Sequence, residues 1–148
     1  MADVFVTAQT NEIALVAATT KTVLQIFPPA NRRLRIRSWG VFFDGTSETN
    51  EPVQVELLRQ TTAGTMSALT LVDKQDSGEV IQTAATQNAS AEPAADAILD
   101  VAEVHPQTGY EKFYHPGEEV KVAGSSRLGI RCTAPAGVNV RAKMEFEE

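Results

Sequence analysis

The chain has 148 residues, of which 13 are Lys or Arg and 19 are Asp or Glu, so its formal net charge at pH 7 is −6. A chain of this length can bury a core of its own, and its single Cys cannot form an internal disulfide. The acidic balance argues against a protein that neutralises many nucleic-acid phosphates, and no run of about 18 apolar residues predicts a membrane helix. We therefore expect one domain, residues 1–148, with neither nucleic acid nor a membrane as partner.

The first quarter of the chain predicts an arm followed by strands. Residues 1–11 have no clear periodicity and are predicted to form a loose N-terminal arm. Residues 12–20 contain enough Ala and Leu for a helix, but Ile13, Leu15 and Ala17 also alternate as in a strand, which we favour. Residues 22–27 are apolar and β-branched, and the two prolines that follow end this strand.

The longest predicted strand spans residues 32–44 and contains a cluster of basic residues. Leu34 and Ile36 have one parity, so the charged residues of the other parity are expected on the surface. A Gly directly after Trp39 disturbs the alternation and predicts a bulge near residue 38. The bulge would turn Trp39 into the core, which we favour; without it Trp39 would lie on the outer face. The basic residues are Arg32, Arg33, Arg35 and Arg37.

Arg and Trp are frequent in interface hot spots, because both bury a large area and keep directional polar groups. This segment therefore supplies the predicted partner-binding residues, which are Arg32, Arg33, Arg35, Arg37 and Trp39. The opposite charge collects at Glu145, Glu147 and Glu148. Separated patches of opposite charge suit contacts between subunits, although two solvated strand faces would have the same composition.

Further strands are expected at residues 53–57, 98–105 and 120–122, and residues 73–96 are expected to form a long irregular loop. Near the end, residues 128–132 and 138–146 both alternate with period 2, and a Pro and a Gly lie between them. We interpret this pair as a terminal β-hairpin. About eight short strands separated by turns predict an all-β fold, an antiparallel β-sandwich or jelly roll.

The sequence contains no pattern that predicts catalysis. Glu103 and His105 share a strand face, and Glu111 and His115 follow, but the histidines precede prolines and are expected at strand ends facing water. Cys132 has the parity of buried residues and is interpreted as a small core residue. We predict no catalytic, cofactor-binding or metal-binding residues, no cofactor and no enzymatic activity.

Several segments resemble small virion structural proteins of tailed bacteriophages, and the likeness extends over most of the chain. They are RRLRIRSWGVFFDG at 32–45, HPQTGYE at 105–111, RLGIRCTAP at 127–135 and MEFEE at 144–148. Within that group the chain is most similar to capsid decoration, or cement, proteins. The resemblance implies an oligomer, with a trimer as our expectation, that binds the major capsid protein and stabilises the phage head. It also implies synthesis in the bacterial cytoplasm and a final location on the capsid surface.

A second function remains open from the sequence, namely a carbohydrate- or receptor-binding β-sandwich module associated with the phage tail. Such a module needs an exposed aromatic platform, because sugar rings stack on aromatic side chains. The aromatic candidates for the platform are Trp39, Tyr110 and Tyr114.

Overall fold

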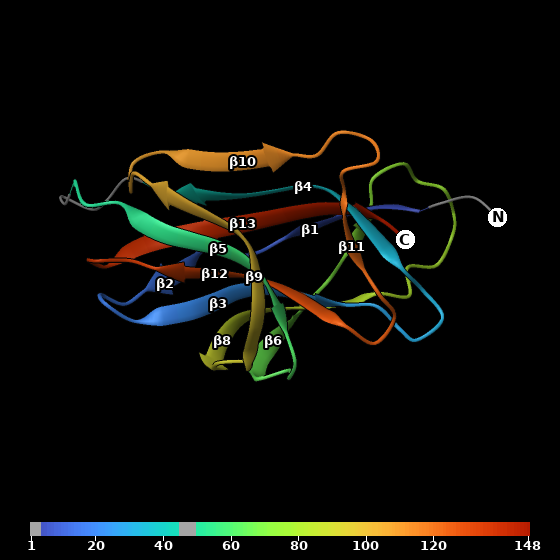
Figure 1. Cartoon of the computed structure of the whole chain (residues 1–148), viewed down its shortest axis with the longest axis horizontal. Helices are drawn as coiled ribbons and strands as arrows, with labels where there is room; N and C mark the ends of the chain where they lie inside the picture. The colour runs from blue at the N-terminus through green and yellow to red at the C-terminus, as the bar shows by residue number, and fades with distance from the viewer. Residues whose placement is uncertain (1–3, 45–49) are drawn as a thin grey trace.

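The structure is a computed structural model that describes residues 4–44 and 50–148 (Figure 1). These residues form thirteen β-strands and no helix, and therefore contain no apolar helix that could span a membrane. All strand pairs are antiparallel, and the strands form two packed sheets. The predicted all-β antiparallel sandwich is confirmed. In Figure 1, β10, β4, β13 and β1 lie above β12, β3, β8 and β6.

The larger sheet has the order β10-β4-β13-β1-β7, with β11 also paired to β4 and β2 to β13. Its strands are β1 (Phe5–Gln9), β2 (Ile13–Leu15), β4 (Leu34–Phe43), β7 (Val72–Asp73), β10 (Gly109–Phe113), β11 (Val120–Val122) and β13 (Val138–Glu147). The smaller sheet has the order β6-β8-β3-β12-β5-β9. Its strands are β3 (Thr20–Phe27), β5 (Val53–Gln60), β6 (Thr65–Leu69), β8 (Ala84–Ala91), β9 (Ala95–Val104) and β12 (Arg127–Thr133).

The core lies between the sheets and depends on strand alternation. On β13 every second side chain is buried, as the sequence predicts, because alternate side chains of a strand point to one face. Leu24, Leu57 and Ile130 of the smaller sheet belong to the same apolar cluster. The buried apolar residues of β13 are Val138, Val140, Ala142, Met144 and Phe146, and Glu145 on the opposite face is also buried.

The predicted bulge in β4 is confirmed and lies at Arg37. Ser38 pairs with Glu145 and Ile36 with Phe146, so Arg37 is the extra residue. The inserted residue shifts the parity of the strand, and as a result Ile36 and Trp39 are both buried. The interpretation that places Trp39 in the core is therefore confirmed, and its placement on the outer face is wrong.

The predicted terminal hairpin is wrong. β12 pairs with β3 and β5, whereas β13 pairs with β4, β1 and β2 in the other sheet. Residues 134–137 thus pass from one sheet to the other. Both strands bury their apolar face in the same core, and a Pro/Gly connection is compatible with either arrangement, so the turn chemistry did not distinguish them.

The predicted arm and loop are also partly wrong, and the chain has more than the eight strands expected. Residues 5–9 of the supposed arm form β1, which pairs with β13 and β7. Within the supposed loop, Asp73 ends β7, residues 84–91 form β8 between β3 and β6, and Ala95 begins β9. β8 buries small or amide side chains at alternate positions, Ala85, Gln87 and Ala89, so its sequence lacks the large apolar residues of a typical strand.

Cys132 on β12 is fully buried, in agreement with the prediction from its parity. Burial, reinforced by the negative charge of Glu56, raises the pKa of its thiol to about 12. We therefore expect native protein at neutral pH to react very slowly with a disulfide reagent such as DTNB, because the thiolate is the nucleophile. Absorbance of the released thiophenolate measures the reaction, and the thiol should react at once in concentrated urea. Rapid reaction of the native protein would contradict the packing of β12.

Candidate interaction surface

Two of the predicted partner-binding arginines form ion pairs within the chain. The Arg35 Nη2 atom lies 2.7 Å from Oε2 of Glu147. The Arg37 Nη2 atom donates to Oε1 of Glu147 at 2.7 Å, and its Nη1 atom donates to Oε1 of Glu119 at 2.9 Å. The Glu119 side chain is only 4% exposed. Arg33 is exposed and Arg32 half-buried, just before β4 begins.

The pairing of β4 with β13 explains these contacts. Arg35 is the register partner of Glu147, so the basic stripe and the acidic chain end lie side by side. The pKa of Glu119 is lowered, chiefly by a hydrogen bond from its own backbone N–H group. A second hydrogen bond, from the N–H of Gly117, and the positive charge of Arg37 lower it further. Two arginines of the basic patch, Arg35 and Arg37, are therefore paired within one sheet with Glu147 of the acidic patch.

The aromatic candidates form an internal cluster. Trp39 Nε1 donates to Oη of Tyr114 at 3.1 Å, and the rings of Trp39 and Tyr110 are 5.4 Å apart. Burial is the main cause that raises the pKa of both tyrosines, and the charge of Asp100 adds to it. Trp39 is fully buried and the tyrosines are half-buried, so the three residues do not form an exposed platform.

The residues considered for metal binding are not brought together. Within residues 4–44 and 50–148, no group of three or more His, Cys, Asp or Glu side chains could hold a metal ion. Glu111 instead forms an ion pair with Lys143 at 2.9 Å, which is the main cause that raises the pKa of Lys143. His115 is exposed, and His105 Nδ1 accepts a hydrogen bond from the N–H of Gln107 at 3.2 Å.

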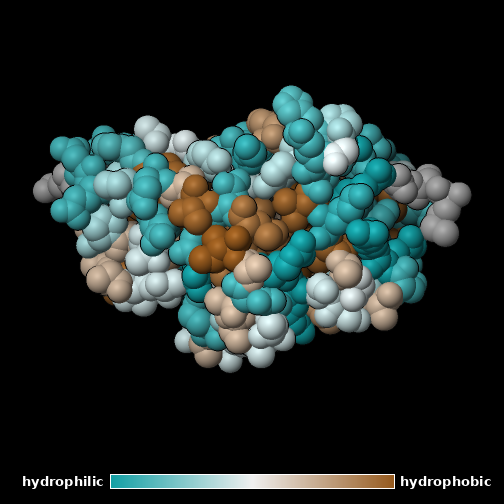
Figure 2. All heavy atoms as spheres, in the orientation of Figure 1, coloured by the Kyte–Doolittle hydropathy of each residue, from teal (hydrophilic) through white to brown (hydrophobic). Residues whose placement is uncertain are grey.

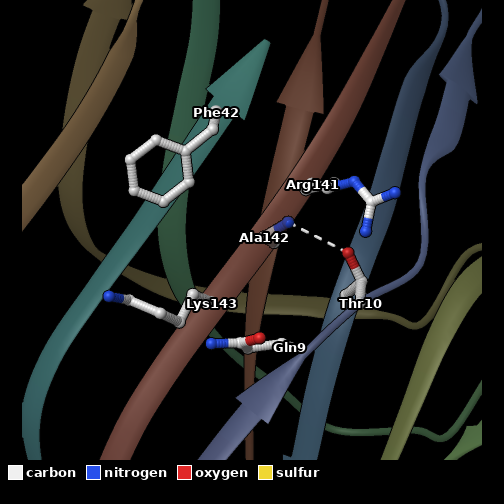
Figure 3. Close-up of a pocket in the computed structure, with 6 residues that line it drawn as sticks. All are labelled: Gln9, Thr10, Phe42, Arg141, Ala142 and Lys143. Carbon is white, nitrogen blue, oxygen red and sulfur yellow. Dashed lines mark hydrogen bonds between the residues drawn. The ribbon is translucent and has the colours of Figure 1, made fainter. Parts of the chain in front are cut away.

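A shallow pocket of about 270 Å³ lies where β1 ends beside β13 (Figure 3). The Thr10 hydroxyl oxygen accepts a hydrogen bond from the N–H of Ala142 at 2.9 Å and so continues the ladder beyond β1. In Figure 3 the Phe42 ring and the Lys143 ammonium lie on one side of β13, and Arg141 lies on the other. The lining residues are Gln9, Thr10, Phe42, Arg141, Ala142 and Lys143, which supply cationic and aromatic surface but no pair of carboxylates for acid–base chemistry.

Among the described strands, β9 carries three exposed large apolar side chains, and no other strand carries more than one. Ile98 is 49% exposed, Leu99 38% and Val101 49%. Figure 2 shows an apolar area at the centre of the view, where Figure 1 draws β9 and its neighbours. Contiguous apolar surface of this kind is typical of contact sites with other molecules. We call residues 95–104 the β9 surface.

The register with β5 shows which way these side chains point. Asp100 lies opposite Leu57, a core residue, so it faces the sandwich interior. Val101 lies opposite Glu56, and Ile98 opposite Leu58, on the outer face of the sheet. The sequence predicts a strand here but not its exposure. The alternation within residues 98–105 identifies a strand and does not say whether it is central or at an edge.

Comparison of the chain with protein-family models, curated proteins and solved structures gives no significant match.

The ion pairs of Arg37 predict a stability effect. Arg37→Ala removes the cationic partner of Glu119 and one of the two ion pairs of Glu147, and we expect the melting temperature to fall by several degrees. Arg33→Ala removes an exposed guanidinium with little burial and should leave the melting temperature almost unchanged. Thermal unfolding followed by circular dichroism measures both. Equal effects of the two substitutions would contradict a structural role for the Arg37 pairs.

Proposed function

We propose that the protein is a structural component of a tailed-bacteriophage virion, a capsid decoration or cement protein that binds the assembled head. The resemblance of its sequence to small virion structural proteins supports the proposal. The single observation that carries it in the structure is the β9 surface, where Ile98, Leu99 and Val101 expose apolar area on a rigid sheet. The proposed partners are the major capsid protein and further copies of the chain, as an oligomer such as a trimer.

The mechanism of such a protein is binding without chemistry. A specific contact of standard size buries about 800 Å² on each partner. A protein that binds only the assembled lattice stabilises it by mass action, because dissociation of the shell then requires release of the bound copies. The sandwich suits this task, since its apolar core and the pairing of β9 with β5 hold the β9 surface in a fixed shape. The proposed location is the outer surface of the capsid.

The internal ion pairs of Arg35 and Arg37 favour the β9 surface over the arginine stripe as the principal contact. A shell protein that bound these arginines would compete with Glu147 and Glu119, which already hold them. Binding at β9 requires no such exchange. The half-buried tyrosines and buried Trp39 likewise give the glycan-binding alternative no platform of its own.

A sedimentation experiment tests the proposal. Purified protein is mixed with empty mature heads and with unexpanded proheads of the phage that encodes it, and the shells are pelleted. We expect co-sedimentation that saturates at a fixed number of copies per shell. Absence of the protein from both pellets would overturn the proposed function.

Two matched substitutions locate the contact. Val101→Ser removes apolar area from the β9 surface and should weaken attachment several-fold, because buried apolar area contributes to affinity. Val80→Ser makes the same change at a residue that is 78% exposed and lies outside β9, and it should leave attachment unchanged. Circular dichroism checks that both variants remain folded. Equal attachment of the two variants would remove the β9 surface from the proposal.

A further inference from the structure

β9 has an open backbone edge as well as an apolar surface. It pairs with β5 along one side, and no other described strand pairs with its second side. Along that side, alternate residues present N–H and C=O groups that a further strand could bind. From Asp100 to Val104 the pairing with β5 is regular over five residues, whereas the register shifts occur nearer the start of the strand. The regularly paired half of β9 therefore offers a template for an added strand.

The charge of β9 indicates the chemistry of its partner. The strand carries three acidic residues and no Lys or Arg. Asp96 and Glu103 are exposed, and Asp100 is half-buried beside Tyr110 and Tyr114. Opposite charges on neighbouring strands stabilise pairing, and like charges destabilise it. A partner strand that combines apolar residues with Lys or Arg fits both the apolar side chains and the carboxylates.

The same charges argue against a second copy of β9 as the occupant. Two β9 strands side by side would double the density of carboxylates along the contact without adding a basic residue. Apolar contacts between the two strands would have to overcome that repulsion. A basic segment from a different protein meets no such cost.

The other sheet edges of the described chain lack this combination. β6, at the far edge of the smaller sheet, carries no charged residue. β7 has only two residues, and β10 carries Lys112 beside Glu111. Native proteins protect long edges with Lys, Pro or bulges; β9 contains no Lys or Pro, and its register shifts lie before Asp100. Its ten residues are the longest edge strand in the described fold.

We propose that β9 receives an extended, basic and apolar segment of a partner protein as an added β-strand, with backbone hydrogen bonds along Asp100–Val104 and ion pairs to Asp96 and Glu103. This inference rests on the proposed function in taking the β9 surface as the contact site, and it specifies how the partner binds there. Strand addition of this kind derives affinity from main-chain bonds and specificity from side chains.

Peptide binding tests the mode directly. The ¹⁵N-labelled full chain is titrated with a synthetic peptide of alternating Val and Arg, and amide hydrogen exchange is read by NMR. We expect slower exchange at alternate amides of residues 100–104, and unchanged exchange at β6, the uncharged edge of the same sheet. A peptide with Glu in place of Arg, and the Val/Arg peptide N-methylated at every residue so that neither edge can donate, should give no protection. Equal binding of either control peptide, or protection at β6, would overturn strand addition at β9.

A pair of neutralising substitutions tests the charge requirement. Asp96→Asn with Glu103→Gln should reduce affinity for the Val/Arg peptide about three- to tenfold, the loss expected for two cross-strand ion pairs. Glu79→Gln with Glu118→Gln removes the same charge from two exposed residues outside β9 and should leave affinity unchanged. Equal affinity of the two double variants would contradict a basic partner. Protection of β9 that increases with the concentration of the protein alone would also contradict a basic partner, because it would identify a second copy as the occupant.

The peptide result and the sedimentation result are separable. Peptide protection at β9 without binding to heads would leave strand addition intact and overturn the capsid function. Binding to heads that Val101→Ser weakens, without peptide protection at β9, would retain the proposed function and overturn strand addition.

Discussion

The burial of one face of β13 against the smaller sheet is the constraint on which the rest of the structure depends. β13 is a central strand, paired with β4 on one side and with β1 and β2 on the other. With Val140, Met144 and Phe146 held in the core, the opposite face of the strand must point to solvent. A slip by one residue would reverse both faces, so the core determines the register of the larger sheet.

That register also determines where the charges go. Glu147 lies beside Arg35, and the bulge at Arg37 brings a second guanidinium to the same carboxylate. The outer face of the larger sheet is thus held by ion pairs within the chain. The β9 surface lies on the other sheet and takes no part in these pairs. Stability and the proposed adhesion therefore depend on different residues, and exposed positions of β9 can be changed without removing a core side chain or an Arg37 ion pair.

The proposed adhesion depends on the place of β9 in its sheet. If another strand or layer followed β9, it would cover Ile98 and Val101. The alternation in the sequence would be the same in that case, so it does not show whether these side chains are exposed. Because residues 92–94 carry the chain from β8 to the opposite edge of the sheet, β9 is left with one neighbour. An exposed edge that combines apolar side chains with carboxylates favours a contact based on both backbone and charge.

The sequence by itself determined the fold class, the strand faces of residues 34–36 and 138–146, the bulge near Ser38 and the burial of Trp39 and Cys132. These features follow from alternation within one strand, a local property that neighbouring residues set. Only the tertiary structure decided that β12 and β13 belong to different sheets, that residues 5–9 pair with the chain end, and that Arg37 binds Glu147. It also decided that β9 is an edge, because strand partners and exposure depend on contacts between residues far apart in the chain.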